Sequence, residues 1–406
     1  MSSLIVTSFA VGLVFVFVSH RLGIPDAIAN FFLQHPVAHW KGRFGYAALT
    51  LIAIVNFQGF SRISLDYLNV ALFLFCGWLA LSITWSHDNR TSIKRVLHGG
   101  ITAAAALSLA TNFNIEERIT LLAVCSGMLL SVAVFESLRI GRLPEPGTGR
   151  FGVTAGPNKH ATNCVVLILS CTFLMMIEWL PSVVGWFIIC LTSGLLYLTR
   201  SRAQLWSCLL ALCLWLALDL ADGGLNQTGY LISVLATCIF SSVLASMLPT
   251  PTPRVPDKQK NTIASAINLG RNVAELKTFN RRLPLWHHVL HNKIPKRILL
   301  GSGYAALWTP DDWEAYPDQC PDHSHCLYLD VLGEAGLVAL VLFVAIALFA
   351  VVTALALPTP HGHFVIAFLA FVLAYSTLDS VFLLRDVESF YLLLLLFNLG
   401  SAAALS

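Results

Sequence analysis

The sequence predicts an all-α polytopic membrane protein with about 12 transmembrane helices and one large helical loop outside the membrane. Two observations support this fold class. Of the 406 residues, 56% are hydrophobic and only 12% are charged, and the mean hydropathy is +0.73. Apolar runs of about 17–25 residues, long enough to cross a bilayer as helix, recur along nearly the whole chain. The alternating segments of about 10 residues that build a membrane β-barrel are absent from the sequence.

We expect three segments: nine spans in residues 1–248, a loop with short helices in 249–326, and three further spans in 327–406. The first apolar run lacks a basic N-terminal region and a small-residue cleavage site, so we interpret it as a retained helix. The expected spans are 3–19, 44–60, 66–85, 95–112, 118–137, 161–179, 181–199, 202–220, 228–248, 328–356, 362–378 and 387–405.

The long loop has its own structural pattern. It opens with Pro-Thr-Pro-Thr-Pro-Arg-Val-Pro, which is typical of an extended spacer. An apolar stripe predicts a helix over Ile263–Phe279. A second helix is expected over Leu283–Lys293, ending before Pro295. A folded segment of this size outside the membrane favours a role in handling substrate.

Most of the 10 cysteines lie inside apolar runs, where they act as small hydrophobic side chains. Cys320 and Cys326 lie near the aqueous loop instead. They are expected either to form a short disulfide in an oxidising compartment or to stay as two separate thiols.

The strip His323-Ser324-His325 runs directly into a long apolar helix. Polar groups at the edge of a membrane are costly unless they serve a function, and an imidazole suits general-base catalysis. Plain interfacial histidines are the simpler interpretation. A metal site is the third, although its spacing is tighter than that of a standard zinc finger. Its candidate ligands would be Cys320, His323, His325 and Cys326, with His287, His288 and His291 from the loop.

Several cations and amides have the pattern of an anion site. Arg200 and Arg202 flank one serine at a helix boundary, where they could hold a diphosphate bidentately or extend to lipid phosphates. Asn158 and Lys159 follow a glycine- and proline-rich turn, which is either structural or anion-facing. The turn is not a nucleotide P-loop, because it lacks the arrangement of a strand, a GxxxxGK(S/T) motif and a helix.

In the loop, Arg282 and Trp286 are one helical turn apart and share a face, as are Asp330 and Glu334 at the next span. The Arg282 pattern is also typical of a solvated basic helix start with an interfacial tryptophan. The scarcity of acidic residues in the middle of the spans argues against a proton-coupled transporter.

Together these stretches resemble the O-antigen ligase/polymerase superfamily of bacterial membrane glycosyltransferases. Cys326 stands where the family usually has asparagine, and Arg281 where it usually has glycine. The resemblance rests on Gly152–Ala161, Leu198–Arg202, Arg282–Trp286 with Leu299–Tyr304, His325 with Leu329, Glu334 and Gly336, and more softly Trp85–Asp88 with Ser92 and Arg95.

The resemblance implies transfer of a glycan from undecaprenyl diphosphate, with inversion and without a metal or other cofactor. His325 would be the catalytic base. Arg202 and Arg282 would neutralise the diphosphate. Arg200, Asn158 and Lys159 would also bind the diphosphate or substrate. The supporting residues would be His323, Glu334 and Trp286.

The expected partners are a lipid-linked glycan donor, membrane lipid, and either lipid A–core or a lipid-linked glycan as acceptor, with no nucleic acid. A ligase that uses lipid A–core is favoured slightly over a repeat-unit polymerase. A transporter, a lipid-linked glycan flippase and an export scaffold are the alternatives of other classes.

The resemblance places the protein in the bacterial inner membrane with the long loop in the periplasm. The distribution of cations predicts the opposite orientation. Most lysines and arginines of the short loops fall on the same side as the long loop, which the positive-inside rule assigns to the cytoplasm. Cations that bind a substrate anion would account for this conflict.

Overall fold

The structure is a computed structural model in which the described residues form helices and no strand. The description covers residues 4, 7–8, 10–12, 38–57, 62–139, 151, 156–223, 225–247, 282–315, 323–380 and 387–400. The expected loop helix Ile263–Phe279, most of the first span and Cys320 lie outside these residues. Contacts divide the chain into two compact units, each assembled from separated segments.

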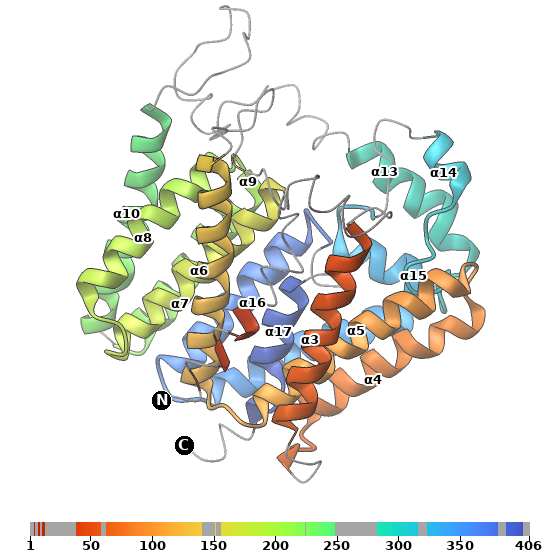
Figure 1. Ribbon diagram of the computed structural model, residues 1–406, viewed down its shortest axis with the longest axis horizontal. Coiled ribbons are helices and arrows are strands. Elements are labelled where there is room, and N and C mark those ends of the chain that lie inside the picture. Colours follow the sequence, from red (N-terminus) through yellow and green to blue (C-terminus); the bar gives the residue numbers. More distant parts are fainter. Residues whose placement is uncertain are drawn as a thin grey trace, which may run out of the picture. The chain divides into compact units, whose positions relative to one another are not determined.

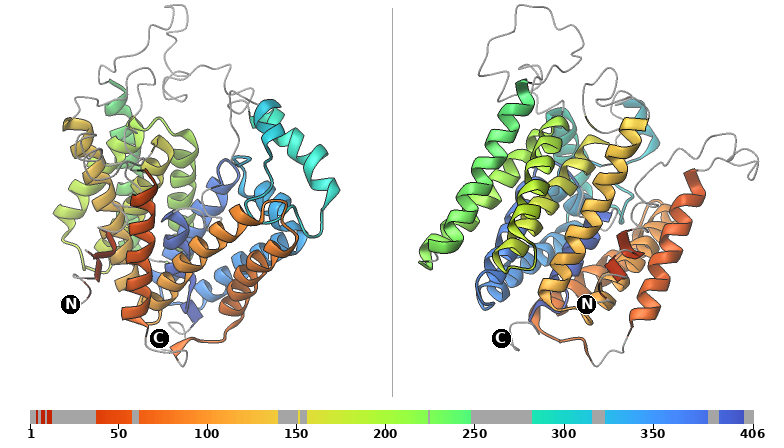
Figure 2. Two further views of the ribbon diagram at one scale, coloured as in Figure 1. Left: turned by 45° about the vertical axis from the view of Figure 1, so that its right-hand side comes forward. Right: turned by 60° about the vertical axis from the view of Figure 1, so that its left-hand side comes forward.

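The first unit comprises Met1–Ile52, Phe113–Arg271 and Thr359–Phe371. In it, α7 packs against α6, α8, α9 and α10, and 89% of its most apolar window is buried. Figure 2 shows α10, in green, alongside α8, and α10 also contacts α9. The main helices are α6 Ile115–Arg139, α7 Pro157–Met176, α8 Ser182–Leu198, α9 Arg202–Ala221 and α10 Leu225–Met247 (Figure 1).

The second unit comprises Ala53–Asn112, Asn272–Pro358 and Val372–Ser406. Here α15 packs along α4, and α17 packs against α5. Two further helices, α3 Ala38–Asn56 and α16 His361–Ser376, contribute residues to both units. The elements of the second unit are α4 Tyr67–Leu81, η2 Ser82–Trp85, α5 Asn89–Ala110, α13 Arg282–His288, η4 Val289–Lys293, η5 Ile294–Lys296, α14 Pro310–Ala315, α15 Leu327–Leu355 and α17 Val387–Leu396.

The all-helical fold is confirmed for the described residues, whereas the expected number of 12 spans is not confirmed. Five helical segments are long and apolar enough to cross a membrane, and four more described helices are apolar but shorter. The expected helix over Leu283–Lys293 is present as α13 and η4. The long candidates are Tyr67–Trp85, Ile115–Arg139, Pro157–Met176, Arg202–Ala221 and Leu327–Leu355.

The helix α15 is broken at Gly336, whose φ of 78° and ψ of −175° are not helical. The backbone groups at the break bond to the preceding segment of the loop. Ser302 N donates to Gly333 O (2.9 Å), Gly303 N to Glu334 O (2.8 Å) and Leu337 N to Ile298 O (2.8 Å). Because buried backbone groups require partners, this segment makes the discontinuous helix possible.

Gly336→Ala should destabilise the second unit. Its backbone conformation is nearly exclusive to glycine and costs other residues on the order of 1–3 kcal/mol. A Cβ there would also overlap the backbone carbonyl of Leu299. We expect a lower apparent Tm for the purified variant in detergent. Gly100→Ala is the matched control, because a Cβ at Gly100 meets open space. Equal Tm values for the two variants would contradict this account.

Asp312 connects its own helix, α14, to α13 and η4. Its carboxylate accepts hydrogen bonds from Lys293 Nζ (2.6 Å) and from the backbone and hydroxyl of Thr309 (2.7 and 2.8 Å), and lies 3.0 Å from His288 Nε2. Burial raises the pKa of Asp312, but the hydrogen bonds from Lys293 and Thr309 outweigh burial and hold the pKa below its ordinary value.

The contribution of Asp312 to stability should therefore depend on pH. Since the folded pKa lies below the unfolded value of about 3.9, the stabilisation is complete above that value and is lost as the pH falls through the folded pKa. We expect amide exchange in α14 to accelerate only in that acidic range. Asp312→Asn should accelerate exchange already at neutral pH, unlike a control Asp311→Asn. Equal exchange in both variants would contradict the prediction.

Candidate functional site

The loop that carries His325 is held by its neighbour Ser324, which is fully buried. Trp286 Nε1 donates to Ser324 O (2.8 Å), and Ser324 N donates to Asp330 Oδ1 in the first turn of α15 (2.8 Å). His325 itself adopts a left-handed backbone conformation, with a φ of 57°. Trp286 therefore supports the histidine loop, and its indole connects α13 to that loop.

His325 lies beside a buried carboxylate. Its Nδ1 is 3.7 Å from Asp379 Oδ1, an ion-pair distance that is longer than a hydrogen bond. Asp379 is only 5% exposed. Its carboxylate accepts hydrogen bonds from the Tyr375 hydroxyl (2.8 Å) and from Ser380 N (2.9 Å). These bonds fix the carboxylate next to the imidazole.

The charge of Asp379 is stabilised by this environment. Burial raises the pKa of Asp379, but the imidazoles of His325 and His323 and the Tyr375 hydroxyl outweigh burial, so the pKa lies below its ordinary value. Asp379 therefore stays ionised at neutral pH and can stabilise an imidazolium.

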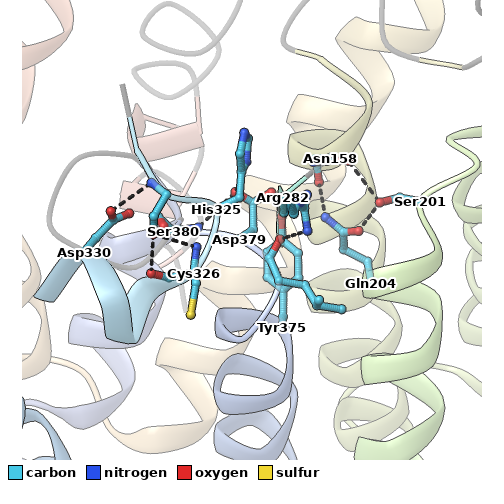
Figure 3. Close-up of polar contacts among 12 residues, drawn as sticks. Asn158, Ser201, Gln204, Arg282, His325, Cys326, Asp330, Tyr375, Asp379 and Ser380 are labelled. Carbon is cyan, nitrogen blue, oxygen red and sulfur yellow. Dashed lines mark hydrogen bonds and ion pairs between the residues drawn. The ribbon is translucent and has the colours of Figure 1, made fainter. Parts of the chain in front are cut away.

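Arg282 joins this group from the start of α13. Its Nη1 donates to the backbone carbonyl of Leu378, the residue before Asp379. Figure 3 shows Arg282, His325, Asp379 and Tyr375 in the same region. Three segments distant in sequence thus bring together a cation, an imidazole and a carboxylate within the second unit: α13, the loop before α15, and the end of α16 with the loop after it.

His323 is close to His325, with ring centroids 4.1 Å apart in an edge-to-face arrangement. In the part of the chain that the structure describes, one group of side chains could hold a metal ion. It comprises His323, His325 and Asp379, whose ligand atoms all lie within 4.8 Å of one another. This group shares His323 and His325 with the ligand set expected from sequence. Its third member is Asp379, which that set did not include.

Glu334 contacts the turn that precedes the histidine loop in the chain. Its Oε2 accepts from Ala305 N (2.8 Å), and its backbone carbonyl accepts from Gly303 N. It holds the turn Gly301–Tyr304 against the break in α15. Among its described contacts, Glu334 therefore supports the fold beneath the histidine loop.

The softer motif at Trp85–Asp88 also contacts this turn. Trp85 Nε1 donates to Leu300 O (2.9 Å), and His87 N donates to Ser302 O (3.3 Å). The motif therefore connects the segment between η2 and α5 to the turn that forms hydrogen bonds with the break in α15.

The remaining predicted residues lie in the first unit, where the N-termini of α7 and α9 meet. Ser201 Oγ donates to Asn158 Oδ1 (3.1 Å) and also contacts Gln204 Oε1, while Gln204 Nε2 donates to Asn158 O (3.1 Å). Figure 3 shows this network of Asn158, Ser201 and Gln204. Ser201 and Gln204 were not expected from sequence as parts of the site.

Three predicted cations lie on these two helix starts. Lys159 is in the first turn of α7, and Arg202 is the first residue of α9. Arg200 is 8% exposed and has a left-handed φ of 50°. Helix N-termini carry partial positive charge, so two of them together with three cations suit an anion.

In the sequence, Asp379 follows an expected span, which by itself predicts no role for it. Tyr375 gave no signal, because a tyrosine near the end of an apolar helix is more often part of the core. The position of Asp379 just after an apolar span was the one clue available, since acids at such depth are rare unless paired.

Residues 186–344 match the family model described as O-antigen ligase. This match confirms the resemblance to the O-antigen ligase/polymerase superfamily over that segment. It includes Arg200, Arg202, Arg282 and His325, whereas Asn158, Lys159 and Asp379 lie outside it. No curated protein matches the chain.

Proposed function

We propose that this protein, which resembles the O-antigen ligase/polymerase superfamily over residues 186–344, is an inner-membrane glycosyltransferase that moves a glycan from undecaprenyl diphosphate to lipid A–core. The family match supports activity of the ligase or polymerase type, and the apolar helices support a multi-pass membrane protein. The observation that carries the finer proposal is the grouping of Arg282, His325 and Asp379 in the second unit.

In the proposed reaction, His325 removes the proton from the acceptor hydroxyl as that oxygen attacks the anomeric carbon of the donor. The bond from this carbon to the diphosphate oxygen breaks, and its electron pair leaves with undecaprenyl diphosphate. One displacement from the opposite face inverts the anomeric centre. The ionised Asp379 stabilises the imidazolium that forms, since an opposite charge nearby favours the protonated ring.

Arg282 is proposed to neutralise charge that develops on the leaving diphosphate. A guanidinium suits this task because it remains charged and can donate two parallel hydrogen bonds to phosphate oxygens. In the first unit, Arg202, Arg200, Lys159 and Asn158 are proposed to bind phosphate, supported by the paired starts of α7 and α9. No metal is required in this scheme, because arginines supply the positive charge.

Asp379→Asn should lower kcat while leaving the KM for the acceptor nearly unchanged. Asparagine keeps the size of the side chain and one oxygen that can accept from Tyr375 or Ser380, but it cannot stabilise the imidazolium by charge. We expect a loss within the roughly 10²–10⁴-fold range of general-base catalysis, with partial rescue in Asp379→Glu. A variant that changes KM alone would contradict this positioning role.

Orientation gives an independent test of the proposal. The transferase requires the long loop on the periplasmic side, whereas the cation distribution predicts the cytoplasm. A topology reporter fused at Asp257 should therefore read periplasmic. A cytoplasmic reading would contradict the proposal.

A repeat-unit polymerase is the second candidate function. The stretch Trp85–Asp88 also resembles a stretch found in exopolysaccharide polymerases.

A further inference from the structure

We propose that His323, His325 and Asp379 form an inhibitory binding site for a zinc ion. The three side chains converge from the loop before α15 and the loop after α16. The inhibitory effect rests on the proposed function, because it requires His325 to be the catalytic base. The binding of zinc by the three residues does not depend on that assignment.

The chemistry of the three side chains suits zinc. Two imidazoles and one carboxylate, with a fourth position open to water, form a common ligand set for this ion. Zinc holds nitrogen and oxygen ligands at about 2.0–2.2 Å, so that neighbouring ligand atoms lie about 3.3–3.6 Å apart in a tetrahedron. His325 Nδ1 and Asp379 Oδ1 are already 3.7 Å apart, and all three ligand atoms lie within 4.8 Å of one another. Small side-chain movements would complete the geometry.

The surroundings hold the ligands in place. Tyr375 donates to Oδ2 of Asp379, and Ser380 N donates to Oδ1, so hydrogen bonds orient both carboxylate oxygens. The histidine loop is fixed by the contacts of Ser324 with Trp286 and Asp330. Such hydrogen bonds from neighbouring groups orient ligands and strengthen metal binding.

Zinc binding and general-base catalysis exclude each other at His325. A neutral imidazole has one ring nitrogen with a lone pair, while the other nitrogen carries a proton. If zinc takes that lone pair, the proton stays on the other nitrogen, and the ring cannot accept a proton from the acceptor hydroxyl. The ring is blocked in this way whether zinc binds Nδ1 or Nε2. Zinc therefore blocks a reaction that needs no metal.

Binding is tested with Zn²⁺ alone on the purified full-length protein in detergent, after removal of metal with a chelator. We expect about one zinc per chain by equilibrium dialysis, and His323→Gln and Asp379→Asn should each weaken binding by at least about tenfold. His291→Gln is the matched control. His291 lies on η4 in an exposed pair with His287, with ring centroids 4.2 Å apart. This variant should bind zinc like the wild type.

Three results would overturn the proposed site. One is the absence of zinc uptake by the wild type. Another is equal affinity in the wild type, His323→Gln and Asp379→Asn. The third is loss of binding only in His291→Gln, which would assign the ion to the exposed pair. X-ray absorption of zinc on the wild type adds a test that needs no variant. Two imidazoles and oxygen ligands are expected, and a sulfur ligand would contradict the site.

Glycan transfer measured in the same preparation separates this inference from the proposed function. Chelator-treated protein should be active, lose activity as zinc occupies the site and recover when chelator is added again. Activity that persists at full zinc occupancy would overturn the inhibitory role. Protein that binds zinc at the three residues but transfers no glycan without zinc would retain the site and contradict the proposed function.

Discussion

His325→Ala should abolish glycan transfer, with kcat falling about 10²–10⁴-fold, the range that loss of a general base produces. The side chain lies beside the ionised Asp379, on a loop anchored by Trp286 and Asp330. His323 is also close to Asp379, and its ring contacts that of His325. The measurement is initial transfer rate with purified protein, at equal amounts of folded enzyme.

Backbone strain needs a separate control, because His325 has a left-handed φ of 57°. Alanine tolerates that conformation less well than histidine or asparagine does. His325→Asn therefore removes the base while keeping the backbone preference, and it should be as inactive as His325→Ala. His287→Ala, at an exposed position on α13, should retain full activity. Wild-type transfer rates in His325→Asn would contradict the assignment of His325 as the catalytic base.

Arg282→Ala should lower kcat by about 10²–10³-fold, comparable to the loss of one donor that stabilises charge in a transition state. The guanidinium is held by its hydrogen bond to the carbonyl of Leu378, next to Asp379. Arg282→Lys should recover only part of the activity, since an ammonium cannot reproduce the planar, bidentate geometry. Kinetics of all variants with the lipid-linked donor provide the measurement.

The control for Arg282 is Lys296→Ala. Lys296 lies in η5 of the same unit and is exposed, so its loss removes one positive charge at a different place. This variant should keep the wild-type kcat. An Arg282→Ala variant that lost thermal stability but kept its kcat would contradict the catalytic assignment. Arginine would then be a structural link between α13 and the end of α16.

The sequence was sufficient to predict the helical class, because long apolar runs have few alternatives to helix in a membrane. It was not sufficient to predict the break in α15. The 29 residues of Leu327–Leu355 look like one continuous span. The break depends on backbone partners from residues 298–303, and no local pattern shows which carbonyls that segment will satisfy.

The site was predicted in part for a similar reason. His325, Arg282 and Trp286 lie in recognisable motifs, and the structure brings Arg282 and His325 to the same carboxylate region of the second unit. Asp379 lies far along the chain, and only folding places it beside His325. The supporting role expected for Glu334 stays a prediction. The contact described for its side chain is with Ala305 N, next to the turn Gly301–Tyr304.

Glycan transfer to lipid A–core is tested most directly by an assay with purified protein in detergent. The assay contains undecaprenyl-diphosphate oligosaccharide and a chelator, with and without lipid A–core. We expect a glycosylated lipid A–core product that forms only when this acceptor is present. The chelator should not change the amount of product formed. A ladder of longer glycans from the donor alone would instead identify a polymerase. No product under either condition, from folded protein supplied with its cognate glycan, would contradict glycan transfer altogether.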